Sequence, residues 1–410
     1  MTAFEPHASV AWMPSWPRGQ GELQARELFG RTFGAEPDGV WSAPGRVIII
    51  GEHLDYNAGR TMSAATPHRT FLAARPRSDS RIRIVFDQAT ALPGTDGVWE
   101  GDLDDLAPEG LSGWHAYATG TLWALRERGY DGPGLDMAAA TCIPVGAGLS
   151  GWGAMEAVTV LAADALWGLS LGGTEAGRLE LAEVAYEAQN RYIGTPFGGL
   201  DQHTSLRCRD GEAITLSFAE LPPPATRYAL PFREYGLTLL ITRTAHHSPL
   251  VDDQFIMRSR ECAAAARLLG VDFVGRMAEE SDALERVDGI EDGDLRRRAR
   301  HIVTELRRVR AMEAELASTA PAHDRFTEIG RLMYRSHASL ELDFEVSSPA
   351  QNRAVDAAYR AGALGSRMFG AGLGGSTITL VRRTDAERTA HRIREALHEA
   401  GDADPEFLLV

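Results

Sequence analysis

Residues 42–59 read Ser-Ala-Pro-Gly-Arg-Val-Ile-Ile-Ile-Gly-Glu-His-Leu-Asp-Tyr-Asn-Ala-Gly. The apolar run before Gly51 predicts a buried strand that leads directly into Glu52, His53 and Asp55. Strand ends are where open α/β folds present side chains to ligands. Carboxylates there suit a polyhydroxylated molecule, because each can accept two hydrogen bonds from hydroxyls. For this segment taken alone, an ordinary strand followed by a polar turn stays an alternative.

The bulk composition is that of a soluble protein with more than one domain. A chain of 410 residues is too long for one simple core, so two domains are expected. The net charge of −15 argues against a nucleic acid or an anionic membrane as partner. No apolar run is long enough to span a bilayer and no secretory signal opens the chain, so a cytoplasmic location is expected. Three widely spaced cysteines fit neither a disulfide framework nor a zinc site and are expected to be small core residues.

The chain contains no lysine, and all 42 basic residues are arginine. This excludes the P-loop NTPases, whose lysine contacts phosphate, and the protein kinases with their strand lysine. It also excludes Schiff-base chemistry and the Ser-x-x-Lys hydrolases. A phosphate group bound here must therefore be held by backbone amides, arginine, metal or helix dipoles.

Strands and helices alternate in both halves of the chain, which predicts α/β or α+β domains. The run 222–224, three consecutive prolines, is a candidate domain boundary or a surface loop. Apolar residues recur at helical spacing over 295–316, with arginine and glutamate on the other face, so this segment predicts a solvated helix and not a nucleic-acid patch. Strands are expected over 46–51, 69–74, 81–86, 134–143, 236–242 and 376–381, and helices over 21–33, 114–128, 154–167, 178–192 and 295–316.

A glycine-rich turn at 144–151, Pro-Val-Gly-Ala-Gly-Leu-Ser-Gly, separates a predicted strand from a predicted helix. Backbone N–H groups of such a turn and the positive end of the helix can bind an anion without lysine. The turn and residues 370–375 both satisfy G-x-G-x-x-G, but neither is followed by the second strand and acid that dinucleotide binding requires. An NAD site is therefore disfavoured, and a simple tight turn stays the alternative for either loop.

Asp201 follows a second glycine turn at 194–200, where another helix is expected to begin. An acid at that point is often only an N-terminal capping or first-turn carboxylate. Its interpretation as a functional residue depends on the other motifs of the chain.

Together these segments resemble galactokinase and the wider superfamily of galactokinase, homoserine, mevalonate and phosphomevalonate kinases (GHMP kinases). Residues 43–57 resemble the galactokinase signature, 144–150 the phosphate loop, 198–202 the Cys-Gly-Ile-Met-Asp-Gln segment, and 366–375 the glycine-rich third motif. The motifs occur in the family's order and cover nearly the whole chain. The resemblance implies an α+β fold with an N-terminal ribosomal-protein-S5-like domain, 1–215, and a C-terminal ferredoxin-like domain, 216–410.

The resemblance also implies roles for individual residues. Asp201 would orient and deprotonate a sugar hydroxyl, and Arg46 would keep Asp201 ionised and stabilise charge on the moving phosphoryl group. ATP and Mg²⁺ would be the nucleotide and the metal ion, with Ser150 and Gln189 on the metal side. The substrate would contact Glu52, His53, Asp55, Gly199 and Phe255, and the nucleotide would contact Gly146, Ala147, Gly148, Leu149, Ser150, Gly151 and Trp152.

The nucleotide half departs from the family pattern Leu-Ser-Ser-Ser-Ala. Trp152 stands at its third serine, and Gln189 stands where the family has a Mg²⁺-binding acid. Glutamine is a poorer ligand than glutamate for a hard cation. On the sugar side, Ile48 replaces an asparagine and Phe255 a tyrosine that touches galactose.

These departures leave three functions open. The first is an ATP-dependent kinase for a sugar or a sugar-like cyclitol with a rearranged phosphate loop. The second is a catalytically silent relative that binds or senses a sugar. The third is another reaction on a phosphorylated substrate, with the glycine loops holding the phosphate. Retention of both Arg46 and Asp201 favours the kinase, because a protein that only binds sugar does not need the pair.

Overall fold

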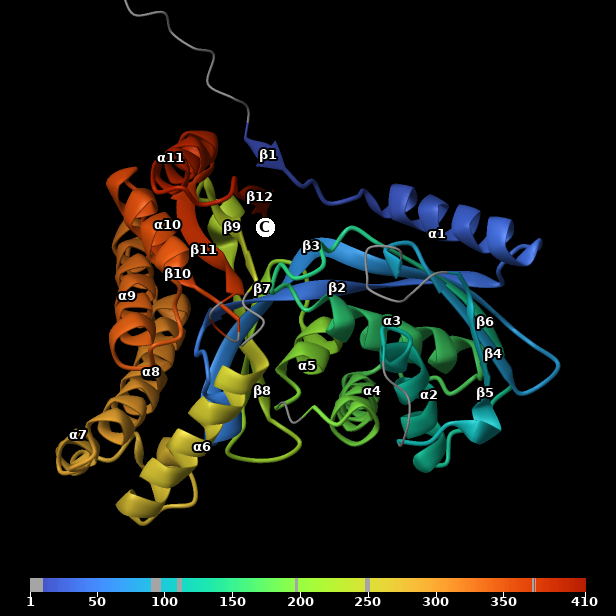
Figure 1. Cartoon of the computed structure of the whole chain (residues 1–410), viewed down its shortest axis with the longest axis horizontal. Helices are drawn as coiled ribbons and strands as arrows, with labels where there is room; N and C mark the ends of the chain where they lie inside the picture. The colour runs from blue at the N-terminus through green and yellow to red at the C-terminus, as the bar shows by residue number, and fades with distance from the viewer. Residues whose placement is uncertain are drawn as a thin grey trace, which may run out of the picture. The chain divides into compact units, whose positions relative to one another are not determined.

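The computed structural model describes residues 10–89, 97–108, 113–195, 198–247, 251–370, 372 and 374–410. They form two compact units: one contains Ser15–Leu230, and the other contains Pro231–Val410 with residues 10–14. Both are visible in Figure 1.

The division lies beyond the boundary expected at 215/216, and the reason is a strand pair. That boundary falls inside strand β7 (Glu212–Ser217), which pairs with β8 (Ala225–Ala229). The prolines at 222–224 join these two strands, so they form a loop within the first unit. The chain leaves this sheet only after β8.

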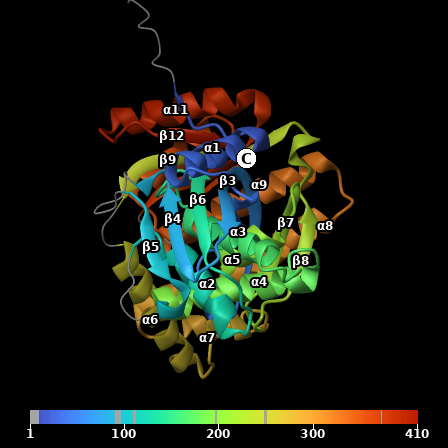
Figure 2. The same cartoon turned by 90° about the vertical axis from the view of Figure 1, so that its right-hand side faces the viewer.

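The first unit contains a seven-stranded sheet in the order β5-β4-β6-β3-β7-β8, with β2 paired to β3 as well. Figure 2 shows β5, β4, β6 and β3 side by side. Its other strands are β2 (Gly39–Ile50), β3 (Arg60–Pro76), β4 (Arg81–Phe86), β5 (Trp99–Asp102) and β6 (Leu135–Thr141), and its helices are α1 (Arg18–Phe33), α2 (Ala116–Glu127), α3 (Gly151–Leu166), α4 (Glu175–Glu187) and α5 (Leu200–Arg207), with short 3₁₀ turns at Asp55–Asn57 and Leu103–Asp105.

Alternation of side chains along β3 gives this sheet two apolar faces. Phe71 and Ala73 pack into a cluster with Phe29 of α1. Leu72 and Ala74 belong to the larger cluster, which includes residues of α2, α3 and α4. In Figure 1, α1 covers one face and α2 to α5 cover the other. The sheet is therefore the middle layer of three.

Strand β2 runs antiparallel to β3, and its register shifts between Pro44 and Arg46 and again between Ile48 and Ile50. Such irregularities redirect the side chains around them. A Cβ on Gly45, between the first pair, would lie 2.5 Å from the carbonyl oxygen of Leu149. Only glycine permits this close approach, so the backbone before Arg46 is seated directly against the phosphate loop.

The second unit contains a five-stranded sheet in the order β1-β12-β9-β11-β10. Its apolar cluster includes Leu240 and Val381 of the sheet together with Ile393 and Leu397 of one helix. The strands are β1 (Ala11–Trp12), β9 (Leu237–His247), β10 (Gly365–Met368), β11 (Gly374–Arg382) and β12 (Glu406–Leu409), the helices are α6 (Val251–Leu269), α7 (Ala283–Asp288), α8 (Gly293–Ala317), α9 (Ala322–Leu342), α10 (Pro349–Arg360) and α11 (Ala386–Glu399), and 3₁₀ turns occupy Pro231–Arg233, Val274–Met277 and Arg383–Asp385.

Most expected elements are present, with shifted ends. The helix expected over 178–192 ends as α4 at Glu187 and continues as a wider π-helical turn, Ala188–Ile193. The cysteines are free thiols, but only Cys262 is buried, so the expectation of core residues is wrong for the two half-buried ones, Cys142 and Cys208. Within the described ranges, no helix is long and apolar enough to cross a bilayer.

Candidate active site

Asp201 and Arg46 form a direct ion pair across 155 positions of sequence. Arg46 Nε donates to Asp201 Oδ1 at 2.6 Å, and Arg46 Nη1 donates to the carbonyl oxygen of Gly148 at 2.7 Å. The Asp201 side chain is 28% exposed, which leaves it open to a ligand. The structure thus brings the expected base, the expected arginine and the phosphate loop into one place within the first unit.

Helix α5, which carries Asp201 in its first turn, is fixed to the sheet by hydroxyl groups. The hydroxyls of Thr204 and Ser63 of β3 lie 2.6 Å apart, and Ser205 Oγ donates to the carbonyl oxygen of Pro44 at 2.7 Å. Both contacts are buried. They hold the start of α5 against the strands from which Arg46 projects.

Gly199 lies in the turn that begins α5, with φ of +82°. A Cβ at this position would lie 2.8 Å from the ring of Tyr186, so the turn requires glycine on two grounds. Its expected contact with substrate stays a prediction, as does that of Phe255, which is half-buried on α6 of the other unit.

The loop after β2 is held in a fixed shape by its own side chains. Gly51 and His53 both have positive φ, +101° and +62°. Asn57 Nδ2 donates to the carbonyl oxygen of His53 at 2.8 Å, and His53 Nδ1 lies 2.9 Å from the hydroxyl of Tyr56. Glu52 and His53 are buried. Positive φ is uncommon for a residue with a side chain, and the contacts of His53 with Asn57 and Tyr56 hold it in this conformation.

Asp55 links this loop to the turn before Asp201. Its Oδ2 accepts a hydrogen bond from the backbone N–H of Gly198 at 3.3 Å. Burial raises the pKa of Asp55 to about 6, backbone N–H groups including that of Gly198 oppose the rise, and the negative charge of Asp201 adds to it. At neutral pH Asp55 is an ionised acceptor placed near the Asp201 carboxylate.

The phosphate loop turns sharply between β6 and α3. Gly146, Gly148 and Ser150 all have positive φ, of +76°, +72° and +58°. Ser150 precedes α3 without capping it through its side chain, and the first turn of α3 contains no acidic residue. The positive end of the helix therefore lies beside the carbonyl of Gly148 that Arg46 contacts, which is a suitable arrangement for an anion.

The first turns of α3 and α5 approach each other at Gly153. A Cβ there would lie 2.4 Å from Ser150 Oγ and 2.9 Å from Asp201 Cβ. Within the part of the chain that the structure describes, Ser150 Oγ is buried and has no hydrogen-bond partner. The missing side chain at Gly153 thus lets the phosphate loop lie directly against the expected catalytic carboxylate.

Trp152 packs its indole into an aromatic cluster. The ring stacks on Tyr117 of α2, with centroids 4.7 Å apart and planes 8° apart, and it lies 6.0 Å from the ring of Phe86 of β4. Offset stacking of this kind is favourable by about 0.5–1.5 kcal/mol beyond area burial. The indole at 152 is therefore part of the apolar packing, and the position supplies no hydroxyl.

A buried polar cluster that sequence reasoning missed lies behind Asp201. Gln202 Nε2 donates to Glu156 Oε2 at 2.6 Å and also to Gln189 Oε1. Burial raises the pKa of Glu156 well above its usual range; the bond from Gln202 opposes the rise and the charge of Asp201 adds to it. The available signal was an acid inside the otherwise apolar start of α3.

The residues expected on the metal side do not fit a protein-held Mg²⁺. Ser150 supplies a hydroxyl and Gln189 an amide whose oxygen already accepts from Gln202. Magnesium sites usually combine one or two carboxylates with phosphates and water. Among the residues that the structure describes, no three His, Cys, Asp or Glu side chains are grouped so as to hold a metal ion.

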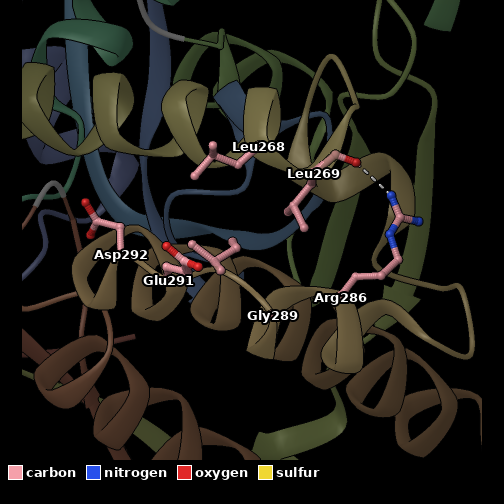
Figure 3. A pocket seen from close by; sticks show the side chains of 7 residues that line it. Leu268, Leu269, Arg286, Gly289, Glu291 and Asp292 are labelled. Carbon is pink, nitrogen blue, oxygen red and sulfur yellow. Dashed lines mark hydrogen bonds between the residues drawn. The ribbon is translucent and has the colours of Figure 1, made fainter.

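A separate hollow lies in the second unit, where the end of α6 faces the connection between α7 and α8 (Figure 3). Arg286 is engaged there, because it donates to the carbonyl oxygen of Leu269 at 2.8 Å and to Glu280 at 2.6 Å. The hollow is lined by the exposed side chain of Leu268 together with Glu291 and Asp292. None of the sequence motifs contributes to it.

Three family models match the chain in the expected order. They are the galactokinase galactose-binding signature over residues 27–76, the GHMP kinases N-terminal domain over 116–209 and the GHMP kinases C-terminal domain over 314–399. The galactokinase of Streptomyces coelicolor is 38% identical over 378 residues, which cover 92% of each chain. This chain belongs to the galactokinase family. The galactokinase of Roseiflexus is 35% identical over 386 residues, 93% of this chain and 92% of that one.

Solved structures agree with the galactokinase assignment. The Lactococcus lactis galactokinase complexed with galactose superimposes with a TM-score of 0.82 at 28% identity, covering 94% of this chain and 96% of that one. A Methanococcus jannaschii mevalonate kinase shares the fold, with a TM-score of 0.63 at 17% identity. The expected two-domain α+β GHMP-kinase fold and the class, a kinase that phosphorylates an alcohol group, are confirmed. In the expected third motif, residues 371 and 373 lie outside the described residues.

Proposed function

We propose that this galactokinase-family protein transfers the terminal phosphoryl group of ATP to a hydroxyl of galactose or of a sugar or cyclitol with similarly placed hydroxyls. The observation that carries the proposal is the Arg46–Asp201 ion pair at 2.6 Å, with the phosphate loop bound to the same arginine. The identity with galactokinases and the galactose-binding signature support a galactose-like substrate.

The proposed reaction needs positioning and charge stabilisation more than covalent chemistry. Asp201 accepts a hydrogen bond from the attacking hydroxyl and takes its proton as the new oxygen–phosphorus bond forms. The bond between the terminal phosphorus and the bridging oxygen breaks at the same time, and ADP leaves. Arg46, which pairs with Asp201, stabilises the charge that develops on the phosphoryl oxygens.

The substrate would be held by the loop after β2. Carboxylates of Glu52 and Asp55 can each accept hydrogen bonds from two hydroxyls, and the ring of His53 can bind another. The rigid shape of this loop, fixed by the contacts of His53 with Tyr56 and Asn57, would orient the sugar before transfer.

The second candidate function is a sugar sensor without catalytic activity. Two observations favour it: Trp152 fills an aromatic cluster where a serine is expected, and Gln189 is neutral. A sensor would bind sugar by the same loop but would not bind ATP measurably.

The test is incubation of the purified protein with ATP, Mg²⁺ and a panel of hexoses and cyclitols, with products read by mass spectrometry. A phosphorylated product from at least one of them is expected. Calorimetric titration with each sugar and with ATP accompanies the assay. Sugar binding by the folded protein without ATP binding or product would overturn the kinase and favour the sensor.

A further inference from the structure

We propose that no side chain of this site coordinates a divalent cation directly, and that the phosphates of a bound nucleotide are neutralised by Arg46 and the N-terminal end of α3. The inference deepens the proposed function and rests on it. It concerns how the negative charge of the nucleotide phosphates is neutralised, because the residues expected on the metal side are where this chain departs from the galactokinase motifs.

Among the described residues, the carboxylates near the phosphate loop each accept a hydrogen bond from the protein, and the exposed part of Asp201 faces the sugar hydroxyl in the proposed reaction. Asp201 accepts from Arg46 Nε at 2.6 Å, and Asp55 accepts from the Gly198 N–H on the sugar side. Glu156 is 0% exposed and accepts from Gln202 at 2.6 Å. Mg²⁺ usually keeps several waters when it binds, so a carboxylate with no exposed surface cannot serve it without opening the packing.

The two positions expected to face the metal offer poor ligands. The Trp152 indole is stacked on Tyr117 and has no oxygen to give. The Gln189 side-chain oxygen accepts from the Gln202 amide, which Glu156 shares, so Gln189 would have to break the cluster to coordinate an ion. Ser150 Oγ alone, a single neutral oxygen, would be left for a hard dication.

Positive charge near the loop comes instead from Arg46, part of which Asp201 offsets, and from the N-terminal end of α3. Arg46 lies against the loop through its contact with Gly148, and the first turn of α3 contains no acid to neutralise the helix end. Backbone N–H groups and a guanidinium together can cradle phosphates without a resident metal. In this arrangement, a cation would be bound by the phosphates and water alone.

The test is calorimetric titration of the full-length protein with ADP in the presence and in the absence of Mg²⁺. The ratio of the two dissociation constants measures how strongly the protein couples metal to nucleotide. We expect the wild-type ratio to stay within about threefold, and Q189E, which places a carboxylate at the position expected to face the metal, to raise it to about tenfold or more. E156Q, the matched control, should leave the wild-type ratio unchanged.

Two results would overturn the inference. A wild-type ratio above about threefold would show direct coordination, and its loss in E156Q would assign the ligand to Glu156. The second result, absence of ADP binding under both conditions, would overturn the proposed function as well. A ratio that Q189E leaves at the wild-type value would contradict the explanation that the neutral side chain of Gln189 is what keeps the metal from being coordinated.

Sugar binding separates these failures from misfolding. Galactose titration and thermal unfolding, run on the same samples, show whether each variant is intact. Should Q189E fail to fold, the wild-type and E156Q ratios still decide the question.

Discussion

The loop after β2, residues 51–57 (the sugar loop), which is proposed to hold the sugar, and the phosphate loop, residues 144–151, both lie near Asp201 but are built in different ways. The sugar loop is defined by side-chain chemistry: Asn57 holds the His53 carbonyl, and His53 contacts Tyr56. The phosphate loop is defined by backbone shape and volume, with positive φ at Gly146, Gly148 and Ser150.

The difference explains which substitutions each loop tolerates. A ligand that binds backbone N–H groups and a helix end does not require particular side chains, so an indole at position 152 is compatible with the loop as long as it packs elsewhere. A sugar held by carboxylates and a histidine requires those side chains. The chain accordingly keeps Glu52, His53 and Asp55, and departs from its family in the phosphate loop.

The sharpest test of the sugar side is removal of the charge at the point where both loops meet. Asp201→Asn keeps the size of the side chain but removes the proton acceptor and the partner of Arg46. Loss of a general base typically lowers the rate by about 10²–10⁴-fold. We expect kcat for phosphorylated product to fall by about 10³-fold while the dissociation constant for the sugar changes little.

Asp131→Asn is the matched control for this variant. Asp131 is 81% exposed and pairs with Arg126 on the surface, far in sequence from either loop. Its activity should equal that of the wild type. Full activity in D201N would mean that Asp201 is only a first-turn carboxylate of α5.

A substitution at Gly153 tests whether the phosphate loop needs the free space between α3 and Asp201. The added methyl group of Gly153→Ala would lie 2.9 Å from Asp201 Cβ, so Asp201 or α3 must shift. Misplacement of a catalytic group by about 1 Å can lower the rate by about 10²-fold. We expect kcat to fall by about 10–100-fold in G153A, with a small change in the melting temperature, because alanine stabilises a helix interior by about 1 kcal/mol and offsets part of the strain.

Gly30→Ala supplies the comparison that isolates the steric effect. Gly30 also lies inside a helix, α1, and a Cβ there would meet only the carbonyl oxygen of Ala35, at 3.9 Å. G30A should be slightly more stable than the wild type and fully active. Equal activity of G153A and G30A would show that close approach at Gly153 has no catalytic importance.

Protonation of Asp55 is expected to make the affinity for the sugar, but not the affinity for ADP, depend on pH. Its pKa is raised to about 6 in the folded chain, so it takes up a proton as the pH falls through that value and stops acting as a full acceptor. Below pH 6 the sugar dissociation constant should rise by about tenfold per pH unit, whereas ADP binding should not follow the same curve.

The stability of the folded chain changes with pH in the opposite direction to the sugar affinity. The folded chain binds this proton more tightly than the unfolded chain between pH 3.8 and about 6, so the stability contributed by the carboxyl falls as the pH rises through that window. Asp55→Asn should remove the pH dependence of sugar affinity in calorimetry between pH 5 and 8. A wild-type affinity that is constant over this range would contradict the assignment of Asp55.

Local sequence signals predicted the strands and loops that carry the site, because they depend on short-range chemistry. The run before Gly51 is apolar enough to mark β2, and the glycines of 146–151 mark a turn of positive φ before a helix. The Arg46–Asp201 pair, 155 positions apart, came only from the family resemblance. No property of either residue alone specifies the other as its partner.

What the sequence could not supply is the environment of each polar group. Glu156 lies in an apolar stretch and by sequence is an ordinary helical acid, but in the structure Glu156 and Gln189 both accept hydrogen bonds from the side-chain amide of Gln202. The unit boundary lies later than expected because β7 and β8, which the proline loop joins, pair as an antiparallel hairpin in the sheet of the first unit. Pairing of this kind depends on tertiary packing and has a weak local signature.

The smallest expected effect concerns the stacking that fixes Trp152 on the phosphate side. A double-mutant cycle with Tyr117→Leu and Trp152→Leu isolates the ring pair from the other contacts of each residue. The coupling energy in urea unfolding should be about 0.5–1.5 kcal/mol, the range for stacked aromatic pairs. A parallel cycle of Trp152→Leu with Trp123→Leu, whose ring contacts Tyr192 instead, should give a value near zero. Coupling near zero in both cycles would mean that the indole is not anchored on α2, and the explanation of how the loop accommodates a tryptophan at 152 would fail.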